Sequence, residues 1–264
     1  MRQIRLFTSA FPAAQAARRM EYADVMRRNL ACPSIDSVLV FDEGSRDLPR
    51  DTAKLLVRAF KGRPTYQDYF DWINEIASPG DISIIANADI FFDERVALFR
   101  YWTPPDGVVL ALARWEQADD SGARLRDRND SQDAWVFTGR VRQFNAGYPV
   151  GVVGCDNRFA MELSLAGYSV LNPSFSIRSY HLHSGERGEY EGEGRAGSVA
   201  PPYAYVWPHN LWSLPRTLLH NVVHPRARVG WRFDRRFWSS TLRTHWLRKA
   251  FGILRASSSQ ARRP

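Results

Sequence analysis

The amino-acid sequence predicts an α/β domain with a mixed, mostly parallel sheet flanked by helices. Apolar runs of strand length alternate with amphipathic segments through the first half of the chain, which is the order of strand–helix–strand units. Several of these runs end in an acidic side chain, and open α/β sheets bind their ligands at the carboxyl ends of the strands. With 264 residues, 44% of them apolar, the chain can form one domain of ordinary size and a small appendage.

The individual elements follow from periodicity and from helix-breaking residues. Apolar side chains recur at helical spacing in residues 18–30 and, over three turns, in residues 66–77. A third helix is expected to begin at Asp156, which has the side chain of a helix N-cap. Residues 54–60 fit either a strand or a short helix, and the charged segment 117–131 is expected to be a loop. The expected strands are 4–8, 37–41, 82–92, 108–113 and 133–137, with two more near Val170 and Ile177.

The stretch from Ile82 to Asp93 is the centre of the prediction. Its Ile-rich first half is typical of a strand that is buried on both faces. Asn87 and Asp89 follow at i, i+2 spacing, so an extended chain would point both side chains to the same side. One interpretation is a ligand site, and the other is an Asx turn in which Asp89 caps nearby backbone amides.

Acids and imidazoles recur at the expected strand ends and turns, namely at Asp89, Asp133, Asp156, His181 and His183. Their recurrence at one edge of the sheet favours a shared site. Asp89 and a histidine can share a divalent metal, because carboxylate oxygen and imidazole nitrogen both suit Mn²⁺, whereas Mg²⁺ prefers oxygen alone. Each residue also has an ordinary structural interpretation: an N-cap for Asp156, a turn for Asp133, and surface or structural positions for the two histidines.

Two stretches of the chain together resemble a known family. Residues 154–157 open a helix that ends in Ala166-Gly167-Tyr168, and a strand, Pro173 and a histidine follow. This order resembles the second half of the GT-A-fold nucleotide-sugar glycosyltransferases, and Asn87-Ala88-Asp89 resembles their Asp-x-Asp element. Within that fold, the chain resembles the family-2-like enzymes that build bacterial surface polysaccharides. The resemblance covers residues 4–183 in order and spacing.

The resemblance implies a GT-A-like, Rossmann-like fold and the inverting transfer of a sugar, a hexose or a related one, from a nucleotide-sugar donor to a saccharide acceptor that can be lipid-linked. It implies that a divalent ion, Mn²⁺ or Mg²⁺, binds the donor diphosphate and that Asp156 acts as the general base. The remaining site residues that the resemblance implies are Asp89 and His183, with His181 as the less favoured option, for the metal; Thr8, Asp42, Asn87 and Asp89 for the nucleotide; and Asp133 and Trp135 for the acceptor side.

Two positions depart from the family pattern. Asn87 replaces the first acid of Asp-x-Asp and offers a metal only a neutral carbonyl oxygen. Cys155 stands where a second acid often precedes the base, which leaves Asp156 as the sole acid there. Asn87 therefore keeps open a second hypothesis, in which the chain is a non-catalytic relative that only binds a nucleotide or a sugar.

The positive charge of the chain is concentrated at its C-terminal end. The residues from 205 onward hold 12 of the 36 Lys and Arg residues but only one of the 28 acids, so residues 1–204 carry a small negative net charge. We expect a catalytic domain over residues 1–204, with a mobile loop at 184–198, and a basic, aromatic extension over 205–264. Within that extension, residues 237–255 have the pattern of an amphipathic helix for an anionic membrane surface. The alternatives are a helix packed on the domain, and a nucleic-acid-binding tail that the acidic first 204 residues make the weaker hypothesis.

The sequence also predicts where the protein resides. Only two cysteines occur, Cys32 and Cys155, which favours a reducing compartment without a disulfide framework. The first residues lack the apolar core of a secretory signal, and no run reaches the roughly 18 apolar residues of a membrane span. We therefore expect a cytoplasmic protein, peripheral on the inner face of the membrane if residues 237–255 bind lipid.

Overall fold

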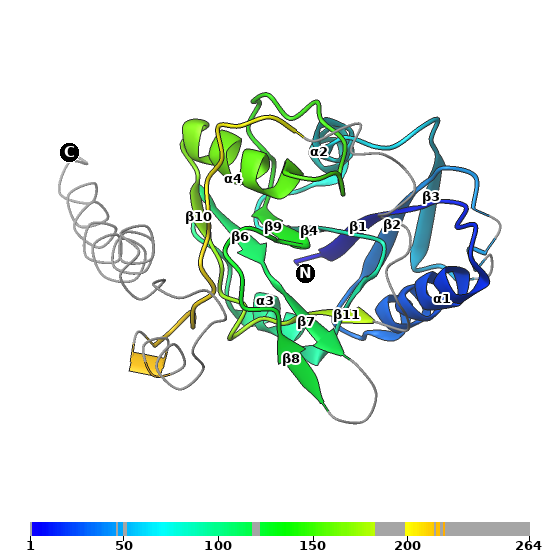
Figure 1. The fold of residues 1–264 in the computed structure, drawn as a ribbon, viewed down its shortest axis with the longest axis horizontal. Coiled ribbons are helices and arrows are strands. Elements are labelled where there is room, and N and C mark those ends of the chain that lie inside the picture. The colour runs from blue at the N-terminus through cyan, green and yellow to red at the C-terminus, as the bar shows by residue number, and fades with distance from the viewer. Residues whose placement is uncertain are drawn as a thin grey trace.

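The computed structural model describes residues 2–45, 47–49, 52–117, 122–182, 199–213, 215–216 and 219. A seven-stranded sheet with the order β10-β6-β9-β4-β1-β2-β3 forms its centre (Figure 1). Its strands are β1 at Ile4–Ala10, β2 at Ser37–Asp42, β3 at Leu55–Ala59, β4 at Ile82–Ala86, β6 at Val108–Leu112, β9 at Ala134–Thr138 and β10 at Ser169–Leu171. Only β9 runs antiparallel to its neighbours in this sheet, so the predicted mixed, mostly parallel sheet is confirmed.

A second sheet has the order β5-β11-β7-β8. Its strands are β5 at Ile90–Phe92, β7 at Arg114–Gln117, β8 at Ala123–Leu125 and β11 at Ser179–Leu182. The prediction of a loop over 117–131 is wrong in part, because β8 pairs with β7 as an antiparallel ribbon with Arg124 exposed and Leu125 buried. The strand expected near Ile177 begins only at Ser179, and the fully buried Ile177 precedes it as a core residue.

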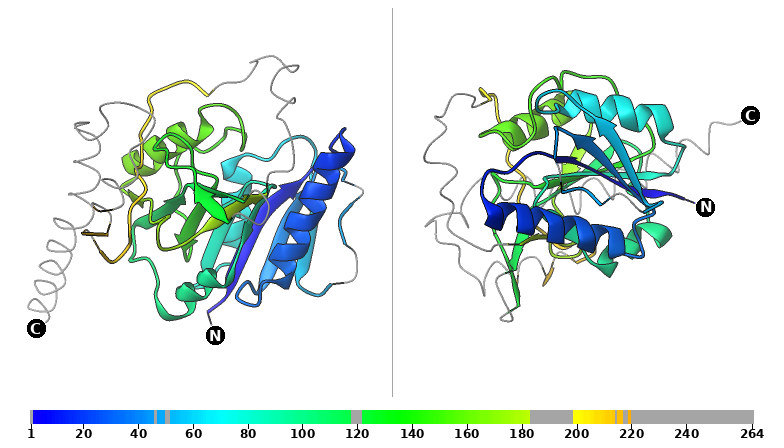
Figure 2. Two further views of the ribbon diagram at one scale, coloured as in Figure 1. Left: turned by 60° about the horizontal axis from the view of Figure 1, so that its bottom comes forward. Right: turned by 90° about the vertical axis from the view of Figure 1, so that its right-hand side faces the viewer.

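The helices are α1 at Ala16–Ala31, α2 at Tyr66–Ile76 and α4 at Cys155–Leu165, with a short turn η1 at Glu94–Ala97 leading into α3 at Leu98–Tyr101. The amphipathic pattern of residues 66–77 thus gives the expected helix. It begins at a capping box, in which the Thr65 side chain accepts from the Asp68 amide and Asp68 accepts from the Thr65 amide. Figure 2 shows α1 and α2 on opposite sides of the large sheet, as predicted.

The two faces of the large sheet carry different cores. On the face covered by α2 and α4, the core is aromatic, and Tyr66 of α2 stacks on Phe159 of α4 with ring centroids 3.8 Å apart. On the face covered by α1 and α3, the core is mainly aliphatic and includes Ile84 of β4 and Met26 of α1. The side chains at the carboxyl edge of the sheet therefore lie at the border of two separate buried cores.

The segment 199–213 packs back over this domain. Val206 and Trp207 are buried, and the His209 amide donates to the Asn172 carbonyl at 2.8 Å. The predicted boundary after residue 204 stays a prediction. Most of the predicted extension, including residues 237–255, and the predicted loop 184–198 lie outside the described residues. Within the part of the chain that the structure describes, none of the helices has the length and apolar character needed to cross a membrane.

Candidate functional site

The chain turns where β4 ends. The Ile90 amide donates to the Asn87 carbonyl at 3.1 Å, and Ile90 then begins β5. The prediction that Asn87 and Asp89 lie on one side of an extended chain is therefore wrong. β4 is paired through Ala86 in the large sheet, whereas β5 pairs with β11 in the small one, so the chain has to change direction between the two strands. The Asp89 carboxylate faces His181, and the Asn87 side chain faces Asp133.

His181 of β11 is the centre of the polar cluster at this edge. Its side chain is 1% exposed, although it carries two polar ring nitrogens. Nε2 lies 3.1 Å from an Asp89 carboxylate oxygen, and Nδ1 lies 2.9 Å from one of Glu116. The contact with Glu116 follows from the topology, because β11 and β7 run parallel with His181 directly beside Glu116. Of the two histidines predicted for the site, the structure places His181 there, and His183 lies outside the described residues.

The carboxylates around His181 set its charge. Burial opposes protonation, but the hydrogen bonds to Asp89 and Glu116 raise the pKa of His181 to about 9. Burial also favours the neutral form of Asp89, but the contact with His181 outweighs it and holds the pKa of Asp89 below its ordinary value. The pKa of Glu116 is lowered for the same reason, with Arg114 contributing. The cluster is therefore an ionised network in which His181 is positively charged.

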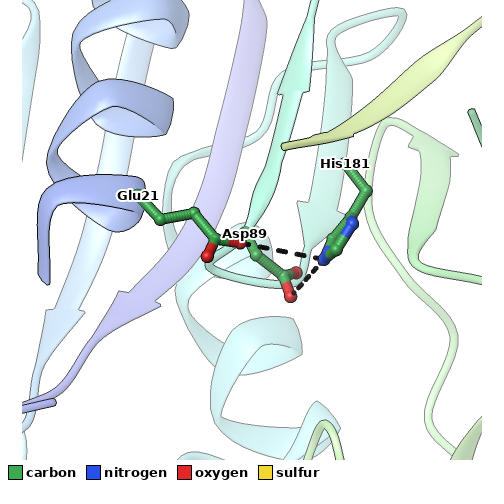
Figure 3. A group of neighbouring side chains, drawn as sticks. All are labelled: Glu21, Asp89 and His181. Atoms are coloured by element: carbon green, nitrogen blue, oxygen red, sulfur yellow. Dashed lines mark hydrogen bonds and ion pairs between the residues drawn. The ribbon is translucent and has the colours of Figure 1, made fainter. Parts of the chain in front are cut away.

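Glu21 of α1 is a third member of this group. One of its carboxylate oxygens lies 3.9 Å from His181 Nε2, so two carboxylates converge on the same nitrogen (Figure 3). Ligand atoms of Glu21, Asp89 and His181 all lie within 4.8 Å of one another, which is close enough to share a metal ion. Sequence reasoning missed Glu21. The available signal was its i, i+4, i+8 spacing with Val25 and Asn29, which are also buried.

Asp133 extends the network toward Asn87. Its Oδ1 accepts hydrogen bonds from the Asn87 side chain at 3.0 Å and from Arg114 at 3.3 Å. The residue is 6% exposed, and Oδ2 is buried with no hydrogen-bond partner among the described residues. Burial raises the pKa of Asp133, with Arg114 opposing the shift and the negative charge of Asp89 adding to it. Asp133 thus couples the His181 cluster to the rest of the edge.

The sequence predicts Asp156 to be the N-cap of α4, but it is the second residue of this helix, two positions after the observed N-cap. Gly154 holds the N-cap position instead, with φ 81°. A side chain there would be strained in the left-handed region, and its Cβ would lie 2.9 Å from the Val199 carbonyl oxygen. Freed from capping, the partly exposed Asp156 carboxylate has a pKa raised to about 7, first by burial and then by the negative charge of Asp133. A carboxyl group with such a pKa can accept a proton at neutral pH.

The other predicted residues occupy less direct positions. Thr8 is buried in β1, and the Asp42 carboxylate accepts hydrogen bonds from the amides of Gly44 and Ser45 in its own turn. The Trp135 ring is 2% exposed and packs edge-on against Phe159, so in this structure it supports the site from the core. Nucleotide contacts by Thr8 and Asp42 and acceptor-side roles for Asp133 and Trp135 stay predictions.

A cavity lies beside the turn at Asn87–Asp89. It is a small, open hollow between the end of β1, α1 and the segment after β2. Its lining includes Phe11, Tyr22, Ser45, Asp47 and Ala88. Two aromatic rings, a hydroxyl and a carboxylate thus surround a space that adjoins Asp89 in the chain. This is a suitable environment for a flat, polar-edged ligand.

Comparison with known proteins identifies no family. No protein-family model matches the chain, and no curated protein matches it. Among solved structures, S. aureus TarS in complex with UDP-GlcNAc is 11% identical with a TM-score of 0.45, over 70% of this chain and 60% of that one. A mannosyltransferase from Pyrobaculum calidifontis in complex with GDP-Man and Mn²⁺ is 12% identical with a TM-score of 0.44, over 71% and 59%. A cytidylyltransferase from Francisella tularensis is 14% identical with a TM-score of 0.32, over 52% and 72%.

The chain therefore spans about three-fifths of the first two structures. Similarity of this size does not identify a function, since one arrangement of strands and helices serves many reactions. The function has to be argued from the side chains at the carboxyl edge of the sheet.

Proposed function

We propose that this chain is a GT-A-like glycosyltransferase that moves a sugar from a nucleotide-sugar donor to a saccharide acceptor with the help of a divalent metal. One observation carries the proposal. At the carboxyl end of β4, the buried His181 presents Nε2 to the carboxylates of Asp89 and Glu21, while Glu116 holds its other nitrogen. A buried imidazole between carboxylates from separate elements is a costly arrangement for a purely structural role.

The donor binds with its nucleoside in the cavity between β1 and α1. The rings of Phe11 and Tyr22 line this cavity and can pack against a base, and Ser45 and Asp47 can hydrogen-bond to the base or the ribose. The diphosphate then lies near Asp89, which the positive charge of Arg18 also reaches. The negative charge of the acids at this edge is thus partly offset by cationic side chains before an anionic ligand binds.

The residues around His181 fit a divalent ion. Two carboxylate oxygens and one imidazole nitrogen form a donor set that suits Mn²⁺ better than Mg²⁺, because Mg²⁺ prefers oxygen ligands. Glu116 fixes the ring through Nδ1, so that Nε2 faces the ion after losing its proton. When bound, the ion supplies positive charge that stabilises the departing diphosphate.

Asp156 is the general base in this proposal. The acceptor hydroxyl oxygen forms a bond to the anomeric carbon, the bond from that carbon to the diphosphate oxygen breaks, and the hydroxyl proton passes to the Asp156 carboxylate. The raised pKa of about 7 suits a group that takes up a proton at neutral pH. A single base and a direct displacement invert the configuration of the anomeric carbon. Asp133, between Asp89 and Asp156, belongs to the wall that the acceptor approaches.

The acceptor itself is proposed from the sequence. Residues 237–255 have the amphipathic and basic pattern of a membrane-surface helix, which suits a saccharide acceptor on a lipid carrier. A flotation assay with anionic vesicles tests this part separately from catalysis. If the protein does not float with the vesicles even at low salt, the proposed membrane contact is wrong, and the transferase proposal is unaffected.

The proposal is tested by a screen of nucleotide sugars with the full chain. We expect one class of nucleotide sugar to raise the melting temperature in the presence of Mn²⁺, and to be hydrolysed or transferred to added saccharides. EDTA should abolish turnover and Mn²⁺ should restore it. Binding of a nucleotide sugar without any turnover would favour a non-catalytic relative. Activity that EDTA does not affect would show that the reaction needs no divalent metal. Salt-sensitive retention on DNA, without nucleotide-sugar binding, would favour a nucleic-acid-binding protein.

A further inference from the structure

Glu21 is an acid on the sheet-facing side of α1. The residue is 4% exposed, at a helix position where an apolar side chain would ordinarily pack. Its neighbour Arg18 donates a hydrogen bond to it at 2.8 Å. Arg18 and the positively charged His181 offset part of the cost of burying this carboxylate, but a buried ion pair is seldom more stabilising than apolar side chains of similar size, so the position calls for a further reason.

The rotation of α1 that buries Glu21 is fixed from the other end of the helix. The Asn29 side chain donates to the Ile90 carbonyl at 2.9 Å and accepts from the Phe92 amide at 3.1 Å, which ties α1 to β5. Val25, one turn earlier on the same face, packs in one cluster with Phe91 of β5 and Tyr180 of β11. Glu21 follows at the same helical spacing, so its carboxylate is held toward Asp89 and His181.

The carboxylates of Glu21 and Asp89 share one nitrogen. His181 Nε2 lies 3.1 Å from Asp89 and 3.9 Å from Glu21, and Glu116 occupies Nδ1 (Figure 3). In the metal-free chain the protonated ring of His181 lies between these two negative charges; once Nε2 loses its proton the carboxylates are left facing each other, and a divalent cation would take the place of that proton. Asp133, which is 6% exposed, adds a buried carboxylate oxygen that has no partner among the described residues to the same network.

Asn87 has a different task in this arrangement. It stands at the first position of the Asp-x-Asp-like element, but its side chain donates to Asp133 at 3.0 Å and its amide donates to the Asp133 carbonyl at 3.1 Å. It brings no negative charge to the ion. Among the described residues, the carboxylate that completes the donor set comes from α1 instead, 68 positions before Asp89.

We propose that Glu21 is a direct ligand of the divalent ion, that it replaces the acid missing at Asn87, and that with Asp89 and His181 it holds Mn²⁺ before any nucleotide binds. This inference rests on the proposed function, because it concerns the same metal. It adds that three protein ligands from separate parts of the chain are enough to bind the ion in the absence of a diphosphate. It also implies that the ion ties α1 to the small sheet, so that Mn²⁺ alone stabilises the fold.

The experiment measures Mn²⁺ binding to the nucleotide-free full chain by calorimetry and by the loss of the free-Mn²⁺ electron paramagnetic resonance signal. We expect one Mn²⁺ per chain and a rise in melting temperature with Mn²⁺ for the wild type. Glu21→Gln should weaken binding by at least the roughly 10–100-fold that loss of an outer-shell partner costs, and should abolish the rise. Its melting temperature without metal is compared with that of the wild type, because the substitution also removes a partner of Arg18 and of the protonated His181, and any fall there measures this structural contribution separately from the loss of the Mn²⁺-dependent rise.

Asp24→Asn is the matched control. It removes an acid from the same helix, but one that pairs with Arg27 and Arg28 away from the cluster, so Mn²⁺ binding should be unchanged. Glu21→Asp keeps the charge and shortens the reach, and tests the same claim if Glu21→Gln does not fold. Asp89→Asn measures the loss of the carboxylate ligand that the proposed function places in the turn after β4.

The outcomes separate this inference from the proposed function. If Glu21→Gln binds Mn²⁺ like the wild type while Asp89→Asn does not, the role of Glu21 is wrong and the metal-assisted transferase stands. If the wild type binds Mn²⁺ only with a nucleoside diphosphate present, the claim of three sufficient protein ligands is wrong. If no Mn²⁺ binds under either condition, the metal itself is removed from the proposed function, and this inference falls with it.

Discussion

Asp89 and Asp156 are acids at the same edge of one sheet, yet their surroundings give them opposite properties. Asp89 contacts the positively charged His181, and its pKa lies below the ordinary value despite burial. Asp156 is close to the negative charge of Asp133 and beside the neutral thiol of Cys155, and its pKa is raised to about 7. One carboxyl group is therefore ionised throughout the neutral range, and the other titrates within it.

The difference shows how one edge can supply both a ligand and a base. A metal ligand has to be ionised at all working pH values, whereas a general base has to gain and lose a proton. The two residues have the same side chain, and one follows a strand while the other lies in the first turn of a helix. The difference between their pKa values therefore comes from the neighbouring side chains. Substitutions at and around the two acids show whether this difference in protonation has functional consequences.

The largest effect is expected from Asp156→Asn. The amide cannot accept the proton of the acceptor hydroxyl, so transfer should fall on the order of 10²–10⁴-fold while donor binding remains. Folding raises the pKa of Asp156 from 3.8 to about 7, so its ionisation disfavours the folded state as the pH rises through that window. The variant should therefore melt no lower than the wild type at pH 8. Initial rates, donor titration and thermal melts check the three statements, and an active variant would refute the base.

A smaller effect is expected from Glu116→Gln, which changes the surroundings of Asp89 through their shared partner His181. Glu116 contacts Nδ1 of His181 and orients the ring, but it lies outside the proposed donor set. Loss of such an outer-shell partner typically weakens metal binding by about 10–100-fold. Mn²⁺ titration of the variant measures this, with Glu75→Gln on the exposed face of α2 as a control. Unchanged Mn²⁺ affinity would mean that Glu116 does not orient His181 for a metal.

The smallest effect concerns the pH dependence of transfer. Because the base has to be ionised, the rate should rise about tenfold per pH unit below pH 7 and level off above it. Asp133→Asn removes the negative charge that raises the pKa of Asp156, so the rise should move to lower pH. The pH profiles of kcat/KM for both proteins provide the comparison. Identical midpoints would show that Asp133 does not act on the base.

Much of the fold could be predicted from local patterns. The strands 37–41 and 108–113 and the helix 66–77 are where periodicity places them, because apolar spacing follows directly from burial on one or both faces. The ribbon of β7 and β8 could not be predicted, since its residues are mostly polar and pair only because the small sheet gives β7 a place beside β11. The sequence leaves open whether the chain continues as a strand or turns after β4, for a similar reason, because the direction of β5 depends on its pairing with β11.

The candidate site divides in the same way. Asp89, Asp156 and His181 could be selected because they stand at strand ends and element starts, which are local properties. Glu21 was not selected, because the spacing of Tyr22, Met26 and Leu30 is a stronger local signal than the mixed stripe to which Glu21 belongs. Its burial depends on the rotation of α1, which Asn29 fixes through β5.

The sequence by itself determined the alternation of strands and helices and the types of side chain at the carboxyl edge of the sheet. Hydrophobic period and turn chemistry are local, and they are complete in the sequence. Only the tertiary structure decided which of these side chains meet and how they are charged. His181 contacts acids from α1, the turn after β4, and β7, and separations of 65 to 160 residues along the chain carry no local signal. Contact between charges over such separations depends on the packing of whole elements, and so do the pKa values of Asp89 and Asp156.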